Sequence, residues 1–273
     1  MLPMNNPLMN FFYEGPVRRW FLCLLMKMGL PKLMVKYLNS PMSKNFIQKY
    51  IAKNDIPMDE FKGKEYKSFA EFFVRKKEKI SFDPDPDHFI SPCDGWFSAY
   101  PIRSDSSFEI KGSHYRVCDL IDDEQTAEEF YDGICFIFRL SPSDYHHYAF
   151  VDDGYVGPEH YIEGTLHSVQ PVSCEAIDVY RLNRRCWTLL ETEHFGKIVQ
   201  IEIGALAVGG IVNDKENDNF KKGEYMGHFE LCGSTIVMLI RKNMLKLLPE
   251  IQSSVDSGQE HKVFQGMYIA DRI

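Results

Sequence analysis

Three polar residues have side chains whose types could together perform nucleophilic chemistry. His146 lies shortly after an apolar run and is followed by a second histidine, His147. Asp94 and Ser234 each lie in a short glycine-containing segment. An imidazole with a pKa near neutrality can act as a general base, a carboxylate can orient it, and a serine hydroxyl can be the nucleophile. The sequence therefore permits an Asp–His–Ser arrangement that acts at Ser234.

Taken singly, each of these residues also has an ordinary structural explanation. Adjacent side chains on an extended segment point to opposite faces, so only one of His146 and His147 can line a given site. The segments around Asp94 and Ser234 are typical of turns. The glycines of 204–210 match neither a dinucleotide fingerprint nor a P-loop, and the seven scattered cysteines include no Cys-x-x-Cys pair that would indicate zinc. We therefore predict no metal site.

A wider pattern is present, because these residues fall in order within segments that together resemble the phosphatidylserine decarboxylase family. The resemblance runs from about Phe69 to Leu239. Its segments are Phe69-Ala-Glu-Phe-Phe-Val-Arg75, Ser91-Pro-Cys-Asp-Gly95, Leu140-Ser-Pro-Ser-Asp-Tyr-His146, Ser168-Val-Gln-Pro171, Gly204-Ala-Leu-Ala-Val-Gly209 and Lys222-Gly-Glu-Tyr-Met-Gly-His-Phe-Glu-Leu-Cys-Gly-Ser-Thr235. The last segment is the most specific, since its ending in Gly-Ser-Thr at this distance from the C-terminus is hard to obtain by chance.

The resemblance implies a proenzyme that cleaves itself before the serine of Gly-Ser-Thr. The scissile bond here would join Gly233 and Ser234. The serine hydroxyl would attack the preceding carbonyl in an N-to-O acyl shift, and elimination followed by hydrolysis would leave a pyruvoyl group derived from Ser234. The products would be a β chain of residues 1–233 and an α chain of residues 234–273, which remain associated.

The resemblance also implies a role for each site residue. His146 would activate Ser234, with Asp94 orienting and charging the imidazole. The pyruvoyl ketone would form a Schiff base with the amine of the substrate and draw electrons as CO₂ leaves, so that neither PLP nor a metal is required. The positions that would bind substrate are His147, Ser168, Gln170 and Thr235.

The chain departs from the family pattern near two of these positions. Family members commonly have Asp-Tyr-His-Arg-x-His, whereas this chain has His147 in place of the arginine and Ala149 in place of the second histidine. Gln170 replaces a common asparagine. We expect self-cleavage to be retained, because Asp94, His146 and the Gly-Ser-Thr sequence are intact.

Residues 1–53 form a basic and apolar arm on an acidic chain. They carry eight Lys and Arg against one acid, although the whole chain has a net charge of −8. Proline and glycine positions predict short helices over 16–28 and 31–38 and a third after Pro41, each with an apolar and a basic side. Such helices lie on a membrane surface or pack on the body of a protein. The longest apolar run in the arm, seven residues from Trp20, is too short to span a bilayer.

The remaining pattern predicts an α+β fold, in which short N-terminal amphipathic helices precede a mostly antiparallel β-sheet or barrel-like sandwich. A capping box at Ser68 predicts a short helix, and the Asp-Pro repeat at 83–87 predicts a linker. We therefore expect a helical N-terminal region over 1–82 and a catalytic domain over 83–273. Strands are predicted over 133–140, 185–190, 197–203, 205–208 and 235–240, and a helix over 242–253.

The leading hypothesis is a pyruvoyl-dependent phosphatidylserine decarboxylase that produces phosphatidylethanolamine. It would be peripheral on the cytoplasmic face of the cell membrane, with residues 1–53 on anionic lipid, and a homodimer is left open. The acidic body excludes nucleic acid as a partner, because such sites need clustered cations. The alternatives are a soluble decarboxylase of the same family acting on free aromatic amino acids, a serine hydrolase using Asp94, His146 and Ser234, and a non-catalytic lipid-binding module.

Overall fold

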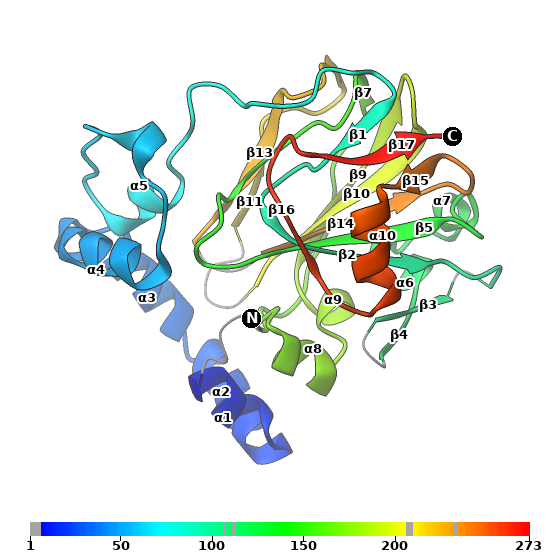
Figure 1. The fold of residues 1–273 in the computed structure, drawn as a ribbon. Helices are drawn as coiled ribbons and strands as arrows, with labels where there is room; N and C mark the ends of the chain where they lie inside the picture. Colours follow the sequence, from blue (N-terminus) through cyan, green and yellow to red (C-terminus); the bar gives the residue numbers. More distant parts are fainter. Residues whose placement is uncertain (1–6, 106, 111–112, 206–209, 232–233) are drawn as a thin grey trace.

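The helical N-terminal region and a body of antiparallel sheets form two distinct parts of the molecule (Figure 1). A computed structural model describes residues 7–105, 107–110, 113–205, 210–231 and 234–273. In this part of the chain, no helix combines the length and the apolar character needed to cross a membrane. The helices of the N-terminal region are α1 (Pro7–Tyr13), α2 (Pro16–Lys27), α3 (Leu30–Leu38), α4 (Lys44–Asn54) and α5 (Phe69–Phe73), with 3-10 turns at Pro41–Ser43 and Asp59–Phe61.

The three helices predicted in the arm are confirmed as α2, α3 and α4. Proline occupies the first turn of α2 and of α3, and Gly29 between them has a left-handed φ of 88° that ends the first helix. The capping box is also confirmed, because the Ser68 side chain accepts a hydrogen bond from the Glu71 N–H at 3.2 Å. Helix α1 was not predicted from the sequence.

The largest sheet has the strand order β12-β7-β9-β10-β14-β5-β2-β16, with β8 paired to β9. Each of its pairings is antiparallel, and its two edge strands do not pair with each other among the described residues. The expected α+β class is therefore confirmed as an open, sandwich-like arrangement. The strands are β2 (Gly95–Pro101), β5 (Ile134–Leu140), β7 (Gly154–Val156), β8 (His160–Ile162), β9 (Arg185–Thr192), β10 (Gly196–Ile203), β12 (Asp218–Phe220), β14 (Ser234–Ile240) and β16 (His261–Val263).

Both faces of this sheet are buried along its central strands. On β14, Ile236 and Met238 join one hydrophobic core, whereas Val237 and Leu239 join a second core on the opposite face. A strand buried on both faces favours apolar residues at successive positions. This explains the nearly continuous apolar runs from which β5 and β14 could be predicted.

Smaller elements cover the two faces. The remaining strands are β1 (His88–Ile90), β3 (Ser107–Ile110), β4 (Ser113–Arg116), β6 (His147–Ala149), β11 (Gly210–Asn213), β13 (Tyr225–Glu230), β15 (Leu245–Leu247) and β17 (Tyr268–Arg272). The remaining helices are α6 (Val117–Ile121), α7 (Glu124–Glu128), α8 (Pro171–Ala176), α9 (Val179–Leu182) and α10 (Pro249–Asp256).

One helix predicted near the C-terminus is partly a strand in the structure. The helix expected over 242–253 is wrong in its first half, where Leu245 and Leu247 pair with β17 as strand β15 and only the part from Pro249 is helical. The strand expected over 205–208 falls almost wholly outside the described residues.

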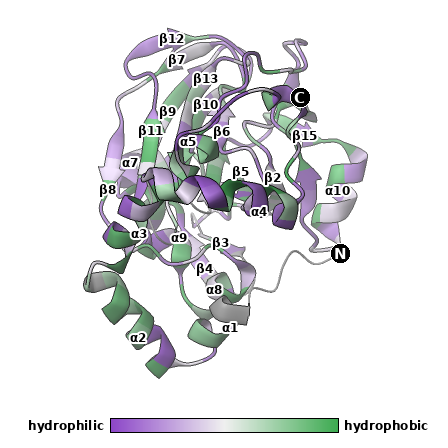
Figure 2. Ribbon diagram, turned by 90° about the vertical axis from the view of Figure 1, so that its left-hand side faces the viewer, coloured by the Kyte–Doolittle hydropathy of each residue, from purple (hydrophilic) through white to green (hydrophobic). Residues whose placement is uncertain are grey.

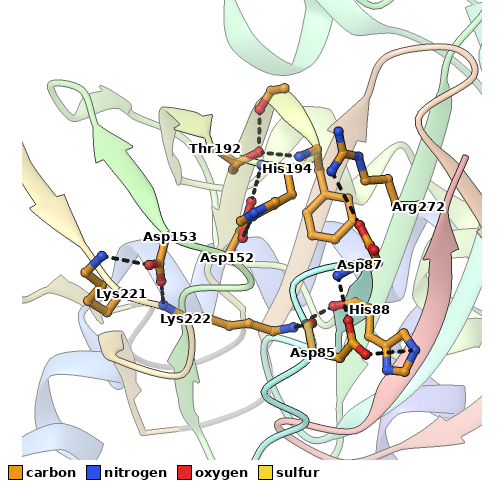
Figure 3. Close-up of polar contacts among 12 residues, drawn as sticks. Asp85, Asp87, His88, Asp152, Asp153, Thr192, His194, Lys221, Lys222 and Arg272 are labelled. Atoms are coloured by element: carbon orange, nitrogen blue, oxygen red, sulfur yellow. Dashed lines mark hydrogen bonds and ion pairs between the residues drawn. The ribbon is translucent and has the colours of Figure 1, made fainter.

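The predicted linker is fastened to the body of the protein (Figure 3). Lys222 Nζ donates hydrogen bonds to the backbone oxygens of Asp85 and His88, at 2.5 and 2.6 Å. The Lys222 N–H donates to the Asp153 carboxylate at 2.8 Å, and burial lowers the pKa of the Lys222 amine. Lys222 thus holds the chain both within the Asp-Pro repeat and just after it. The domain boundary at residue 83 stays a prediction.

Candidate active site

Ser234 and His146 lie side by side at one end of the central strands. Ser234 begins β14 and pairs with Leu140, the last residue of β5. After Leu140 the chain reverses in a tight turn, where the Asp144 carboxylate accepts a hydrogen bond from the Ser141 N–H at 2.6 Å. The reversal returns His146 to the serine, and Ser234 Oγ lies 3.4 Å from His146 Nδ1.

This pair is enclosed by protein. Ser234 is 1% exposed and His146 is fully buried. The Phe73 ring of α5 stacks on the imidazole with ring centroids 4.3 Å apart. The predicted nucleophile and base are therefore brought together in a buried site, whereas Gly233, the other half of the expected scissile bond, lies outside the described residues.

The environment of His146 changes its acidity. Burial lowers the pKa of His146 to about 3, and the positive charge of Arg75 acts in the same direction, while the negative charge of Asp144 opposes both. The near-neutral pKa expected from the residue type alone does not apply, because the sequence does not reveal burial. The imidazole is consequently neutral at physiological pH, and Nδ1 can accept a proton. Its Nε2 has no hydrogen-bond partner among the described residues.

Asp94 lies close to this pair but contacts the backbone. Its carboxylate accepts hydrogen bonds from the Gln265 N–H at 2.9 Å and from the Tyr145 N–H at 3.4 Å. Burial raises the pKa of Asp94. Within the described structure no hydrogen bond joins Asp94 to His146, and the carboxylate that most raises the pKa of His146 is Asp144. The role assigned to Asp94 stays a prediction, and its contact with Tyr145 would act on the histidine through the backbone.

His147 points away from the pair. Its Nε2 donates to the Val74 carbonyl at 3.0 Å, and its ring stacks on those of Tyr145 and His228, each at 4.9 Å between centroids. Burial lowers the pKa of His147 to about 4. This histidine therefore joins the segment after α5 to β6 and β13, and a contact with substrate stays a prediction.

The other proposed substrate residues lie on two different elements. Ser168 is buried, and its Oγ accepts a hydrogen bond from the Gln170 N–H at 3.2 Å at the start of α8. Thr235 follows Ser234 on β14, so its side chain lies on the opposite face of the sheet, where Oγ1 has no partner among the described residues. Their roles in substrate binding stay predictions.

Sequence reasoning missed the contacts of two residues beside His146 and of one residue beside Ser168. Phe73 and Asp144 lie within the segments that carry the family resemblance, so their positions were marked but their contacts were not. Tyr13, whose hydroxyl accepts a hydrogen bond from the Ser168 N–H at 3.1 Å, had no signal in the sequence. The contacts of Phe73 and Tyr13 join segments that are distant in the sequence, and the effect of Asp144 on His146 depends on the burial of both side chains.

Comparison with known proteins finds one family repeatedly. The family model described as phosphatidylserine decarboxylase matches residues 67–270. "Phosphatidylserine decarboxylase proenzyme 2" of Clostridium acetobutylicum is 38% identical over 270 residues, which cover 98% of this chain and 92% of that protein. "Phosphatidylserine decarboxylase proenzyme" of Desulfitobacterium hafniense is 35% identical over 86% of this chain and 82% of its own length. The protein of that name from Clostridium perfringens is 34% identical over 96% and 92%.

The fold, the site and these matches define the class of the protein as an enzyme of the carboxy-lyase type. The chain belongs to the phosphatidylserine decarboxylase family.

Proposed function

We propose that this chain converts phosphatidylserine into phosphatidylethanolamine and CO₂, with a pyruvoyl group made from Ser234 by autocatalytic cleavage. The observation that carries the proposal is the buried contact between Ser234 Oγ and His146 Nδ1 at 3.4 Å. The family membership of the chain supports the choice of substrate.

The contact supports a self-cleavage step. The neutral His146 takes the proton of the Ser234 hydroxyl at Nδ1, and Oγ attacks the carbonyl carbon of residue 233. The peptide C–N bond then breaks, and the proton passes to the Ser234 nitrogen, which leaves an ester. A distance of 3.4 Å is long for a hydrogen bond, and such pairs commonly shorten only as the reaction proceeds. The burial of both side chains limits competing attack by water.

The residues around Ser234 fit a pyruvoyl group at this position. The group would begin the α chain at a buried place, beside an imidazole whose Nε2 has no partner among the described residues. It would supply an electron-withdrawing carbonyl that accepts the electrons released as the carboxylate leaves. The neutral His146 would take up a proton that the ammonium group of the substrate must lose before it reacts, and would then give that proton to the α-carbon as CO₂ leaves.

The pairing of strand β14 in the sheet supports the proposal that the two chains remain associated after cleavage. Strand β14 would belong to the α chain, and it is hydrogen bonded on one side to β10 and on the other to β5, both in the β chain. Its side chains also contribute to both hydrophobic cores. Cutting before Ser234 therefore leaves these contacts intact, and residues 234–273 would stay in place.

The exposed apolar side chains of the arm support the proposal that the protein lies peripherally on the anionic cytoplasmic face of the membrane. Figure 2 shows α2 as largely hydrophobic, at the end of the molecule away from most of the β-sheet. Val17 is 77% exposed, Trp20 65% and Leu33 66%. The exposed large apolar side chains of the arm are Phe11, Val17, Trp20, Phe21, Leu24, Met28, Leu30, Leu33, Met34, Tyr37, Met42 and Phe46. Such a concentration of apolar side chains beside lysines and arginines is typical of a surface that lies on lipid.

A decarboxylation assay tests the proposed function. The purified protein is incubated with phosphatidylserine in vesicles, and in parallel with free phenylalanine and tyrosine, and CO₂ release is measured. We expect release from phosphatidylserine alone and none from the Ser234→Ala variant, which cannot form the cofactor. Release from the free amino acids alone would replace the proposal with a soluble amino-acid decarboxylase. Release of a fatty acid or another hydrolysis product by the uncut chain would point to a serine hydrolase.

Vesicle pelleting tests the membrane position. We expect the chain to sediment with vesicles containing anionic phospholipid, and the Val17→Ser/Trp20→Ala double variant to sediment less. Ile273→Ser removes an apolar side chain that is 71% exposed on the body of the protein, so it is a matched control and should sediment normally. Equal sedimentation of all three proteins would contradict a role for the arm, and a stable dimer that hides the arm would indicate a second copy as its partner.

A further inference from the structure

The arm contacts the body at the segment that carries the predicted substrate residue Ser168. Tyr13, the last residue of α1, is 4% exposed. Its Oη accepts a hydrogen bond from the Ser168 N–H at 3.1 Å and lies 3.1 Å from His167 Nδ1. One hydroxyl therefore contacts two consecutive residues of the segment that leads into α8.

The two contacts of Tyr13 are chemically compatible. Because the hydroxyl oxygen accepts from the Ser168 N–H, its own proton is available for His167 Nδ1. This donation needs a neutral imidazole. Burial lowers the pKa of His167, and the positive charge of Arg19 lowers it further, so the neutral form is favoured. Tyr13 thus makes two directed hydrogen bonds in a partly buried site.

The same segment is tied on its other side to the catalytic sheet. Asn183 is fully buried, and its Oδ1 accepts from the His167 N–H at 2.8 Å. Its Nδ2 donates to the His167 carbonyl and to the Gly204 carbonyl, both at 2.8 Å. Gly204 directly follows β10, whose last residue, Ile203, pairs with Thr235 beside Ser234. Hydrogen bonds therefore lead from the arm, through residues 167 and 168, to the strand next to the reacting serine.

Helices α1 and α2 together have one face that packs on the body of the protein and one face that is exposed to solvent. Tyr13 and Leu22 are buried against Val172 and Ala176 of α8, and α8 lies near α1 and α2 in both views (Figure 1, Figure 2). Arg19 also donates to the Ala176 carbonyl at 2.7 Å. On the same two helices Trp20 is exposed to solvent. One face is thus open to a lipid surface while the other holds the segment 167–170.

We propose that Tyr13 is a positioning residue of the active site, which holds residues 167–170 in the conformation that binds the polar headgroup of the substrate. The arm is then a part of the substrate-binding site as well as a lipid anchor. This inference rests on the proposed function, because it assumes that Ser168 and Gln170 contact the substrate.

Two variants of the full-length protein separate positioning from anchoring. Tyr13→Phe removes only the hydroxyl and keeps the buried ring. Trp20→Ala removes an exposed apolar side chain from the neighbouring helix and serves as the matched control. Each protein is assayed with phosphatidylserine in vesicles and with dihexanoyl phosphatidylserine below its micelle concentration, since the short-chain substrate does not require anchoring to a bilayer.

The positioning role predicts different results for the two variants. Tyr13→Phe should lower kcat/KM for the short-chain substrate about 3- to 10-fold, chiefly by raising KM, because the loss of a hydrogen bond has an effect of this size. It should self-cleave and sediment with vesicles as the wild type does. Trp20→Ala should match the wild type on the short-chain substrate and lose activity on vesicles.

Two results would overturn the inference, and they are distinguishable. A Tyr13→Phe variant whose KM and kcat on the short-chain substrate lie within twofold of wild type would remove the positioning role and leave the proposed function intact, even if the melting temperature fell. A wild-type protein that releases no CO₂ from either form of phosphatidylserine would overturn the proposed function and this inference with it.

Discussion

The ring of Phe73 stacks on the imidazole of His146, with ring centroids 4.3 Å apart and an angle of 29° between the planes. Phe73 is the last residue of α5, and His146 lies just before β6. A helix of the N-terminal region therefore covers the candidate base. The residues after α5 make further hydrogen bonds to the segment around His146. The Val74 carbonyl accepts one from His147, and the Lys77 N–H donates one to Tyr145 Oη at 2.9 Å.

The first prediction concerns the stacking of Phe73 on His146. Phe73→Leu keeps an apolar side chain but removes the stacked ring, so we expect a loss of about 1–2 kcal/mol in the free energy of unfolding and slower self-cleavage. Phe72→Leu is the matched control, because Phe72 is equally buried on α5 but packs against Tyr66 and Arg75. Urea unfolding and a time course of cleavage measure the two effects. If both variants cleave at the same rate, the stacking has no part in catalysis.

The second prediction concerns the pH dependence of self-cleavage. Burial lowers the pKa of His146 to about 3, so its neutral, proton-accepting form persists well below pH 6.5. Precursor made by cell-free translation should therefore show no loss of cleavage rate with a midpoint near 6.5 as the pH is lowered from 8 to 5. Separation of the two chains on a denaturing gel measures the rate. A fall centred on pH 6.5 would indicate an exposed histidine as the base.

The third prediction concerns a buried acid on the sheet. Glu202 is fully buried on β10, where its Oε1 accepts from Gln200 Nε2 at 2.7 Å, and burial raises its pKa to about 8. Between the ordinary pKa of 4.5 and 8, the folded chain holds a proton that the unfolded chain has lost, so Glu202 lowers stability as the pH rises. The slope is about 1.4 kcal/mol per pH unit at most.

Replacing Glu202 with glutamine should remove this slope. In the uncleavable Ser234→Ala background, the stability of Glu202→Gln relative to its parent should increase from pH 5 to pH 8. Thermal unfolding at several pH values measures the difference, and Glu191→Gln, at an exposed position on β9, controls for the loss of one negative charge. A difference that stays constant with pH would show that Glu202 is ionised in the folded protein.

Much of the fold could be predicted because its signals are local. Proline marks the first turn of α2 and of α3 and Gly29 separates them, and β5 and β14 are nearly continuous apolar runs because both sheet faces are buried there. The segment 242–253 was misassigned because Leu245 and Leu247 become a strand only by pairing with β17, which follows more than twenty residues later in the sequence. Pairing between distant segments leaves no local signal.

The site could be predicted only in part, for the same reason. Its reacting residues were found through a family resemblance that places His146 and Ser234 in fixed segments. The acidity of His146 was not foreseen, since burial and the charges of Asp144 and Arg75 depend on how the chain folds. The contact between Tyr13 and Ser168 joins residues 155 positions apart, and no residue type in either segment indicates it.

The central claim is that this chain cleaves itself at Ser234 to form its own cofactor, and the intact mass of the purified protein tests it most directly. We predict two chains, the smaller of about 4.7 kDa, which is the share of residues 234–273 in a 31.8 kDa chain, with a carbonyl in place of its N-terminal amine. The Ser234→Ala variant should give only the full-length mass. A wild-type protein that shows only the 31.8 kDa chain and still releases CO₂ from phosphatidylserine would contradict the claim.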